Sequence, residues 1–240
     1  MQLPPEITCA SSTIADGNMS FRFGDEAEVV ENRRNFLEQN SMSVNSYTPM
    51  SCTHGEVITL VDAKTAGVGA MSQSQQVVSE VLLTQEKNLA LMVLTADCLP
   101  LCFYDPVTKT IALAHCSRVT TNLLLAQKTV SFLREELAVD PADLIVWSGP
   151  YIHKASYNFP APLPEVHPNM KPFVSEENGV VYIDIAAANR HQLEAVGVPS
   201  AQIHFSDIDT VTSPEYFSHR ESETTNAHAG RFATVLMLRD

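Results

Sequence analysis

The sequence lacks long hydrophobic runs and has few basic residues. No uninterrupted apolar stretch approaches the roughly 18 to 20 residues that cross a bilayer. Pro4, Pro5 and Glu6 stand where an export signal would carry basic and then apolar residues, so we expect a cytoplasmic protein with no membrane partner. Because 15 Lys and Arg face 28 Asp and Glu, the net charge of -13 disfavours nucleic acid as a partner.

Cysteine is scarce as well. Five residues, an odd number at irregular spacing, argue against a disulfide framework and leave free thiols or metal ligands as the interpretations. No repeat, low-complexity tract or linker divides the chain. With 240 residues and 45% hydrophobic content it can bury one sizeable core, and we expect a single domain over residues 1–240.

Apolar periodicity predicts helices at residues 26–38, 121–138 and 186–196. We expect Asp25 to cap the first helix and Thr120 or Thr121 to cap the second. Gly197 and Pro199 should end the third. The five prolines in residues 159–172 exclude regular helix or central strand and predict a loop.

Short apolar runs predict strands at residues 56–61, 89–94, 99–104, 110–114, 144–147, 180–184 and 232–238. The turn signal Asp105-Pro106 joins two of them into a hairpin. Near-continuous hydrophobicity in these strands implies a sheet covered on both faces. Strands and helices that mix without strict alternation predict the α/β class, with a three-layer α/β/α arrangement around a mixed sheet.

Three metal-capable side chains, His54, Cys98 and His115, stand at strand ends or tight turns. Imidazole and thiolate together suit zinc, and three protein ligands leave one coordination position open, as in catalytic zinc sites. Copper is less expected, because an oxidase needs several copper sites and only one such cluster is visible. The ordinary alternative is that each of the three is a turn or core residue.

TADCLPLCFYDP, residues 95–106, resembles the signature of the laccase-domain family, whose members are described as multicopper polyphenol oxidases, purine nucleoside phosphorylases or YfiH-type peptidoglycan editing factors. Further blocks resemble the family in the same order: FGDEAEVVENRR (23–34), THG (53–55), IDIAAANRHQLEAVGVP (183–199), FSHR (217–220) and GRFATVLML (230–238). The resemblance implies a YfiH-like α/β fold and one zinc ion bound by His54, Cys98 and His115.

The resemblance also implies a zinc enzyme that acts on purine nucleosides or related small molecules, by phosphorolysis, deamination of adenosine, or both. Arg118, Arg220 and Arg231 are the candidates for binding an anionic substrate group. Where the family has HAGWRG, residues 115–120 read HCSRVT, so the Trp is absent and Arg118 is displaced by one position. Because a guanidinium fork is rigid, this departure puts phosphorolysis in question unless Arg118 swings into the vacated place.

Asp97 and Glu80 are the candidates for proton transfer; their alternatives are a structural carboxylate that caps backbone groups and a solvated surface residue. Cys52 stands where the family has glutamine and could be a fourth ligand, which would close the site. Tyr157 could stack on a purine or simply pack. Rival hypotheses are a cysteine hydrolase or cell-wall precursor editing amidase with Cys98 activated by His115, and a non-catalytic zinc-binding paralogue.

Overall fold

The computed structural model describes residues 3–162, 167–225 and 229–240, and within them the strands form three sheets. In order across it, the largest contains β13 (Ile203–His204), β9 (Ile145–Ser148), β7 (Leu99–Asp105), β8 (Thr110–Cys116), β5 (Val81–Thr84) and β3 (Ile58–Leu60). The second contains β1 (Ile7–Ser11), β14 (Phe232–Leu238), β6 (Ala90–Thr95), β2 (Tyr47–Ser51) and β4 (Val77–Val78). The third contains β10 (Asn158–Pro160), β12 (Val180–Ile183) and β11 (Val174–Glu177).

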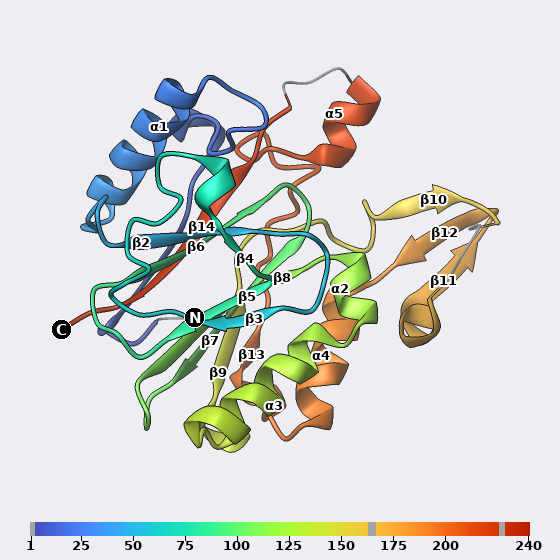
Figure 1. The fold of residues 1–240 in the computed structure, drawn as a ribbon. Coiled ribbons are helices and arrows are strands. Elements are labelled where there is room, and N and C mark those ends of the chain that lie inside the picture. The colour runs from blue at the N-terminus through green and yellow to red at the C-terminus, as the bar shows by residue number, and fades with distance from the viewer. Residues whose placement is uncertain (1–2, 163–166, 226–228) are drawn as a thin grey trace.

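The α-helices are α1 (Glu26–Gln39), α2 (Arg118–Asn122), α3 (Leu125–Leu137), α4 (Ile185–Ala195) and α5 (His219–Thr225). Short 3-10 helices are η1 (Ile14–Asp16), η2 (Gln73–Gln75), η3 (Pro141–Asp143), η4 (Pro168–Phe173) and η5 (Ser200–Gln202). Within the described ranges, no helix has the length and apolar character that a membrane crossing requires. Figure 1 shows α1 on one side of the molecule, α3 and α4 on another, and the small sheet of β10, β11 and β12 extending outward.

The two larger sheets stack on each other between layers of helix. Leu91 of β6 and Leu236 of β14 belong to the same buried cluster as Leu113 of β8, so this cluster fills the space between the sheets. On the outer face of one sheet, Met92 packs in a cluster with Phe36 of α1. Helices α3 and α4 cover the outer face of the other sheet, where a third cluster includes members of both sheet and helices.

The predicted α/β class with mixed sheets is confirmed. The sequence predicted one sheet between two layers of helix, whereas the structure has two stacked sheets between them. Both larger sheets mix directions: β13 beside β9, β3 beside β5, and β2 beside β6 and β4 are parallel, and their other neighbours are antiparallel. Strands β7 and β8 form the predicted hairpin and are buried along their whole length. This hairpin carries Cys98 just before its first strand and His115 near the end of its second.

Helix α1 follows its prediction, with the Asp25 carboxylate accepting from the backbone N–H of Ala27. The prediction of one helix over residues 121–138 was wrong. Leu124 adopts a left-handed backbone conformation, with φ of 62°, and separates α2 from α3. Ser117, rather than either threonine, caps α2.

The proline-rich segment is only partly a loop. Phe159 and Pro160 end β10, at the edge of the small sheet where a proline removes no ladder hydrogen bond. Pro168 begins η4, and Pro172 lies within it. Pro164 falls outside the described residues.

Candidate metal centre and adjoining cavities

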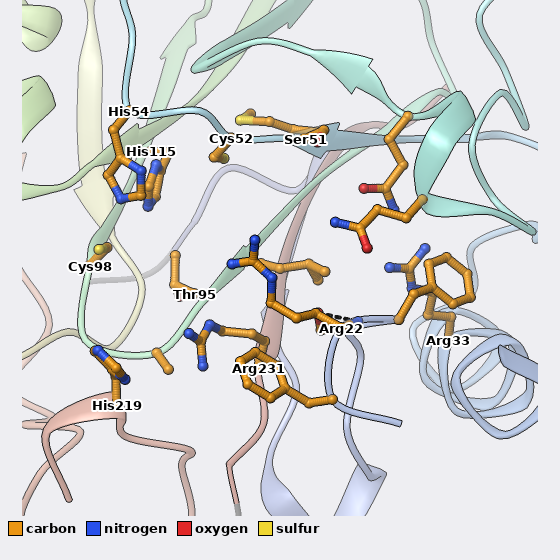
Figure 2. Close-up of a pocket in the computed structure, with 18 residues that line it drawn as sticks. Arg22, Arg33, Ser51, Cys52, His54, Thr95, Cys98, His115, His219 and Arg231 are labelled. Atoms are coloured by element: carbon orange, nitrogen blue, oxygen red, sulfur yellow. Dashed lines mark hydrogen bonds between the residues drawn. The ribbon is translucent and has the colours of Figure 1, made fainter. Parts of the chain in front are cut away.

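His54, Cys98 and His115 converge on one point. One ligand atom from each lies within 4.8 Å of the others, and the two imidazole rings meet edge to face with centroids 5.3 Å apart. Figure 2 shows the three side chains directed toward one another. His115 is 4% exposed, whereas His54 is exposed and Cys98 half-buried, so the cluster has one protected side and one open side. Two nitrogens and a sulfur that lie this close together could hold a metal ion.

The buried carboxylate of Glu80 organises both histidines. Its Oε2 lies 2.8 Å from Nδ1 of His115, which leaves Nε2 of that ring for the cluster. Its Oε1 accepts from the backbone N–H groups of Thr53, at 2.6 Å, and Gly55, at 3.1 Å, on either side of His54. His54 has a φ of 62°, and a strained conformation of this kind persists when the surroundings hold it, as Glu80 does here.

The charges of the cluster favour the thiolate form of Cys98. Burial alone would raise the pKa of this thiol, but the charge of His115 and hydrogen bonds from His115 and His54 outweigh it and lower the pKa to about 6. Burial would lower the pKa of His115, yet the charges of Cys52 and Cys98 raise it well above its usual value. A thiolate is the form of cysteine that binds metal ions and the form that acts as a nucleophile.

Cys52 lies beside the cluster without joining all of it. Its sulfur groups with Glu80 and His115 within 4.8 Å, but the described residues place it in no such group with His54 and Cys98 together. Burial is the largest influence on its pKa, which is raised. Cys52 is therefore a neighbour of His115. The raised pKa of Cys52 favours its thiol form, whereas the lowered pKa of Cys98 favours its thiolate form.

Asp97 makes contacts of a different kind. Its Oδ1 accepts from the Thr210 hydroxyl at 2.7 Å, and its Oδ2 accepts from the backbone N–H of Arg220, in the first turn of α5, at 2.7 Å. Asp97 has a φ of 87°, and its own carbonyl accepts from the N–H of Ile152. Both oxygens are committed to holding α5 and the segment around Thr210, which favours the structural alternative; proton transfer by Asp97 or Glu80 stays a prediction.

Two cavities meet at Cys98. The first, about 440 Å³, is lined by His54, Cys98 and His115 together with Arg22, Arg33 and Arg231 (Figure 2). The second, about 250 Å³, is lined by aromatic rings and by the other two candidate arginines. Ala96, Cys98 and His219 line both. A ligand centred at Cys98 could thus extend one part into each cavity.

The structure separates the three predicted substrate-binding arginines. Arg118 and Arg220 lie in the second cavity, with their guanidinium carbons 5.6 and 4.6 Å from the centroid of Phe159. Arg220 also donates to the Asn158 carbonyl at 2.6 Å. Arg231 lies in the first cavity, 4.5 Å from the centroid of Phe23. Tyr157 faces the second cavity as well, where it stacks at a tilt on Phe159.

The segment that departs from the family pattern is well structured. The Ser117 hydroxyl accepts from the N–H of Thr120 at 3.1 Å, and the Thr120 hydroxyl donates to the His115 carbonyl at 2.8 Å. These bonds cap α2 and fix the chain directly after His115. Arg118 is the first residue of α2, and this position directs it to the aromatic cavity rather than toward Arg231.

Sequence reasoning missed Arg22 and Arg33 as cavity residues. Arg33 is 1% exposed although it is charged, and it lies on the buried face of α1 with Val29 and Leu37. The signal was present in the sequence, because positions 29, 33 and 37 follow a four-residue helical spacing that places an arginine in an apolar stripe. A buried arginine is unusual enough to mark such a position for attention.

Comparison with known proteins shows the family and the fold of the chain. The family model described as multi-copper polyphenol oxidoreductase laccase matches residues 8–239. A purine nucleoside phosphorylase of Streptomyces coelicolor is 31% identical over 218 residues, which cover 89% of this chain and 86% of that protein. One of Bacteroides thetaiotaomicron is 27% identical, covering 96% and 87%. The crystal structure of YlmD from Geobacillus stearothermophilus matches with a TM-score of 0.90 and 26% identity, covering 98% of this chain and 93% of that one.

Proposed function

Since the chain belongs to the multi-copper polyphenol oxidoreductase laccase family, we propose that it is a zinc-dependent purine nucleoside phosphorylase with its ion held by His54, Cys98 and His115. The observation that carries the proposal is the convergence of these three ligand atoms at the junction of two cavities. Relatives that align over most of the chain are named purine nucleoside phosphorylases, which supports a nucleoside as the substrate.

The residues present fit zinc better than a set of coppers. The donor set is one sulfur and two nitrogens, Glu80 holds His115 in the orientation that metal-bound histidines commonly have, and the thiolate is favoured at Cys98. The two possible ligand groups found in the described part of the chain share His115, so they do not form two independent metal sites. Bound zinc would supply Lewis acidity at the junction, which also suits hydrolytic deamination of adenosine as a second activity.

The aromatic cavity suits a purine base. Tyr157 and Phe159 provide ring faces, and Arg118 and Arg220 pack against Phe159 and hold it in place. A base seated there would present its ribose toward Cys98, the residue common to both cavities. We assign Glu80 the task of positioning the two histidines and Asp97 that of holding α5 beside the junction.

The test is phosphate-dependent release of base from inosine and adenosine, with ribose 1-phosphate measured as the second product. We expect turnover by zinc-loaded protein, its loss in Cys98→Ala, and its retention in Cys9→Ala, which removes a thiol remote from the cluster. Activity in a zinc-free Cys98→Ala variant would rule the proposal out. Full zinc occupancy without turnover on any nucleoside would favour the non-catalytic paralogue.

The lowered pKa of Cys98 also supports a second candidate, a cysteine nucleophile activated by His115. The two hypotheses differ in their response to metal removal. A chelator should silence a zinc enzyme and restore or leave intact a cysteine hydrolase, whereas iodoacetamide should inactivate the metal-free hydrolase by reacting with Cys98.

A further inference from the structure

The cavity beside the cluster is positively charged in a protein of formal net charge -13. Arg22, Arg33 and Arg231 line it, and no aspartate or glutamate does so among the residues that the structure describes. Three guanidinium groups in one partly enclosed space produce a local positive potential that the distant acidic surface, screened by salt, does not cancel. The occupant that this potential selects is an anion.

Arg33 is the most informative of the three. Its Nε donates to the Met19 carbonyl at 2.9 Å, and its guanidinium lies 4.4 Å from the centroid of Phe21. Its two terminal nitrogens are buried without a hydrogen bond of normal geometry, and no described carboxylate pairs with it. Burial lowers the pKa of Arg33 and the nearby Tyr47 hydroxyl acts the other way, but that hydroxyl donates its proton to the Ala70 carbonyl. Burying a cation with unmatched donors is energetically unfavourable. The fork of a guanidinium matches two oxygens of a phosphate, which would supply the missing acceptors.

Other donors surround the same space. Gln76 also lines the cavity, and its side-chain nitrogen is buried without a partner. Arg22 is exposed, and its guanidinium has no hydrogen-bond partner among the described residues. Burial lowers the pKa of Arg231, the charges of Cys98 and Asp97 raise it, and the charge of Arg22 lowers it, so the Arg22 and Arg231 cations lie close enough to repel each other. An anion between them would relieve this repulsion.

We infer that Arg22, Arg33 and Arg231, with Gln76, form a binding site for a phosphate-class oxyanion, next to the cluster of His54, Cys98 and His115. The inference deepens the proposed phosphorylase function and rests on it for the identity of the anion as a co-substrate. The oxyanion comes from one of two sources: inorganic phosphate, or the phosphoryl group of a nucleotide. In either case the anion reaches Cys98 through the first cavity rather than through the aromatic one.

For inorganic phosphate the site accounts for the reaction without Arg118. An oxygen of HPO₄²⁻ forms a bond to C1′ of the ribose while the bond from C1′ to the purine nitrogen breaks. The bonding electron pair leaves with the base, and the proton of HPO₄²⁻ ends on that nitrogen. The loss of the family's HAGWRG pattern at residues 115–120 then leaves the phosphate site intact, because none of Arg22, Arg33 and Arg231 belongs to that segment.

The experiment measures binding of inorganic phosphate to the zinc-loaded protein at constant ionic strength, by calorimetry and by ³¹P line broadening. We expect Arg231→Gln, Arg22→Gln and Arg33→Lys each to raise the Kd about tenfold to hundredfold, the range for losing a hydrogen bond to a charged group. Arg34→Gln is the matched control, because Arg34 follows Arg33 on α1 but is exposed and paired with Glu31 at 2.8 Å. In turnover, the KM for phosphate should rise in the same variants while the KM for the nucleoside does not.

Phosphate binding that is equal in Arg231→Gln, Arg22→Gln and Arg34→Gln would overturn the inference, even if Arg33→Lys failed to fold. Phosphorolysis with an unchanged KM for phosphate in these variants would also overturn it while leaving the proposed function standing. Arginine-dependent phosphate binding without phosphorolysis would support the site and reject the function. A titration with inosine 5′-monophosphate distinguishes the sources, because arginine-dependent binding tighter than that of phosphate and inosine would assign the site to a nucleotide.

Discussion

Nδ1 of His115 lies 2.8 Å from Oε2 of Glu80, and through its other oxygen the same carboxylate holds the turn that carries His54. One buried acidic residue therefore sets the positions of two of the three ligand candidates. Neutralising it should loosen both at once. This relationship ties the fold to the proposed metal site, because the Glu80 side chain joins the residue before β5 to the turn that precedes β3, beside the pairing of these two strands.

We predict that Glu80→Gln lowers zinc affinity about 10-fold to 100-fold, the usual effect of removing a partner behind a metal-bound histidine. The physical reason is that an amide is a weaker acceptor for the His115 N–H than a carboxylate. Competition with a chromogenic chelator measures the change. Glu86→Gln is the control, because Glu86 is exposed and remote from the cluster. Equal zinc affinities in the two variants would show that Glu80 does not support the metal ligands.

Alkylation of Cys98 should depend on pH and on metal. In metal-free protein its pKa of about 6 predicts that the thiolate fraction, and with it the rate of reaction with iodoacetamide, rises through pH 6 and levels off above it. Cys116 should stay unlabelled, because burial raises its pKa to about 12. Mass spectrometry of the labelled peptides follows both residues. Zinc should protect Cys98, and equal labelling with and without zinc would contradict its role as a ligand.

The aromatic cavity should govern nucleoside binding alone. Replacing Tyr157 or Phe159 with Leu removes a ring face, and stacking of a base on an aromatic side chain contributes about 1 to 3 kcal/mol. We expect the KM for inosine to rise by about tenfold on that basis, while the Kd for phosphate stays as in the wild type. Phe132→Leu on α3 is the control. A rise in the phosphate Kd of the Tyr157 variant would mean that the two cavities do not act separately.

Asp97 should matter more for folding than for metal binding. Asp97→Ala removes acceptors for Thr210 and for the first turn of α5 and places a side chain without local hydrogen bonding at a φ of 87°. We expect a loss of about 1 to 2 kcal/mol or more in the free energy of unfolding, measured in urea, with zinc content unchanged. Asp25→Ala, which loses the exposed cap of α1, should cost less. An Asp97→Asn protein of wild-type stability without turnover would instead support proton transfer by Asp97.

Much of the fold was predictable because its elements carry local signals. Residues 26–38 show helical periodicity after a capping aspartate, and they form helix α1 as predicted. Residues 232–238 are mostly apolar, and they form strand β14 as predicted. The break at Leu124 was not predictable, because leucine gives no sign of a left-handed conformation that tertiary packing imposes. The stacking of two sheets was hidden as well, since a continuous apolar strand looks the same whether a helix or a second sheet covers it.

The ligand candidates were chosen for their chemistry and their positions at strand ends or turns, and the resemblance joined them into one site, since His54, Cys98 and His115 are too far apart in sequence for spacing to do so. The structure brings them together. It also shows what no sequence pattern indicated, the hydrogen bonds by which Glu80 holds His115 and the turn that carries His54. Arg33 was noted only as part of a predicted helix and of a block that resembles the family. Its importance lies in the missing partners of its terminal nitrogens, which only coordinates reveal.

The most direct test of the account is the metal content of protein purified without added metal, measured by elemental mass spectrometry on the wild type and on Cys98→Ala. The account predicts about one zinc ion per chain in the wild type and close to none in the variant, because the proposed site binds one ion with three protein ligands and loses one of them in the variant. Several copper ions per chain, or zinc retained in full by Cys98→Ala, would contradict it.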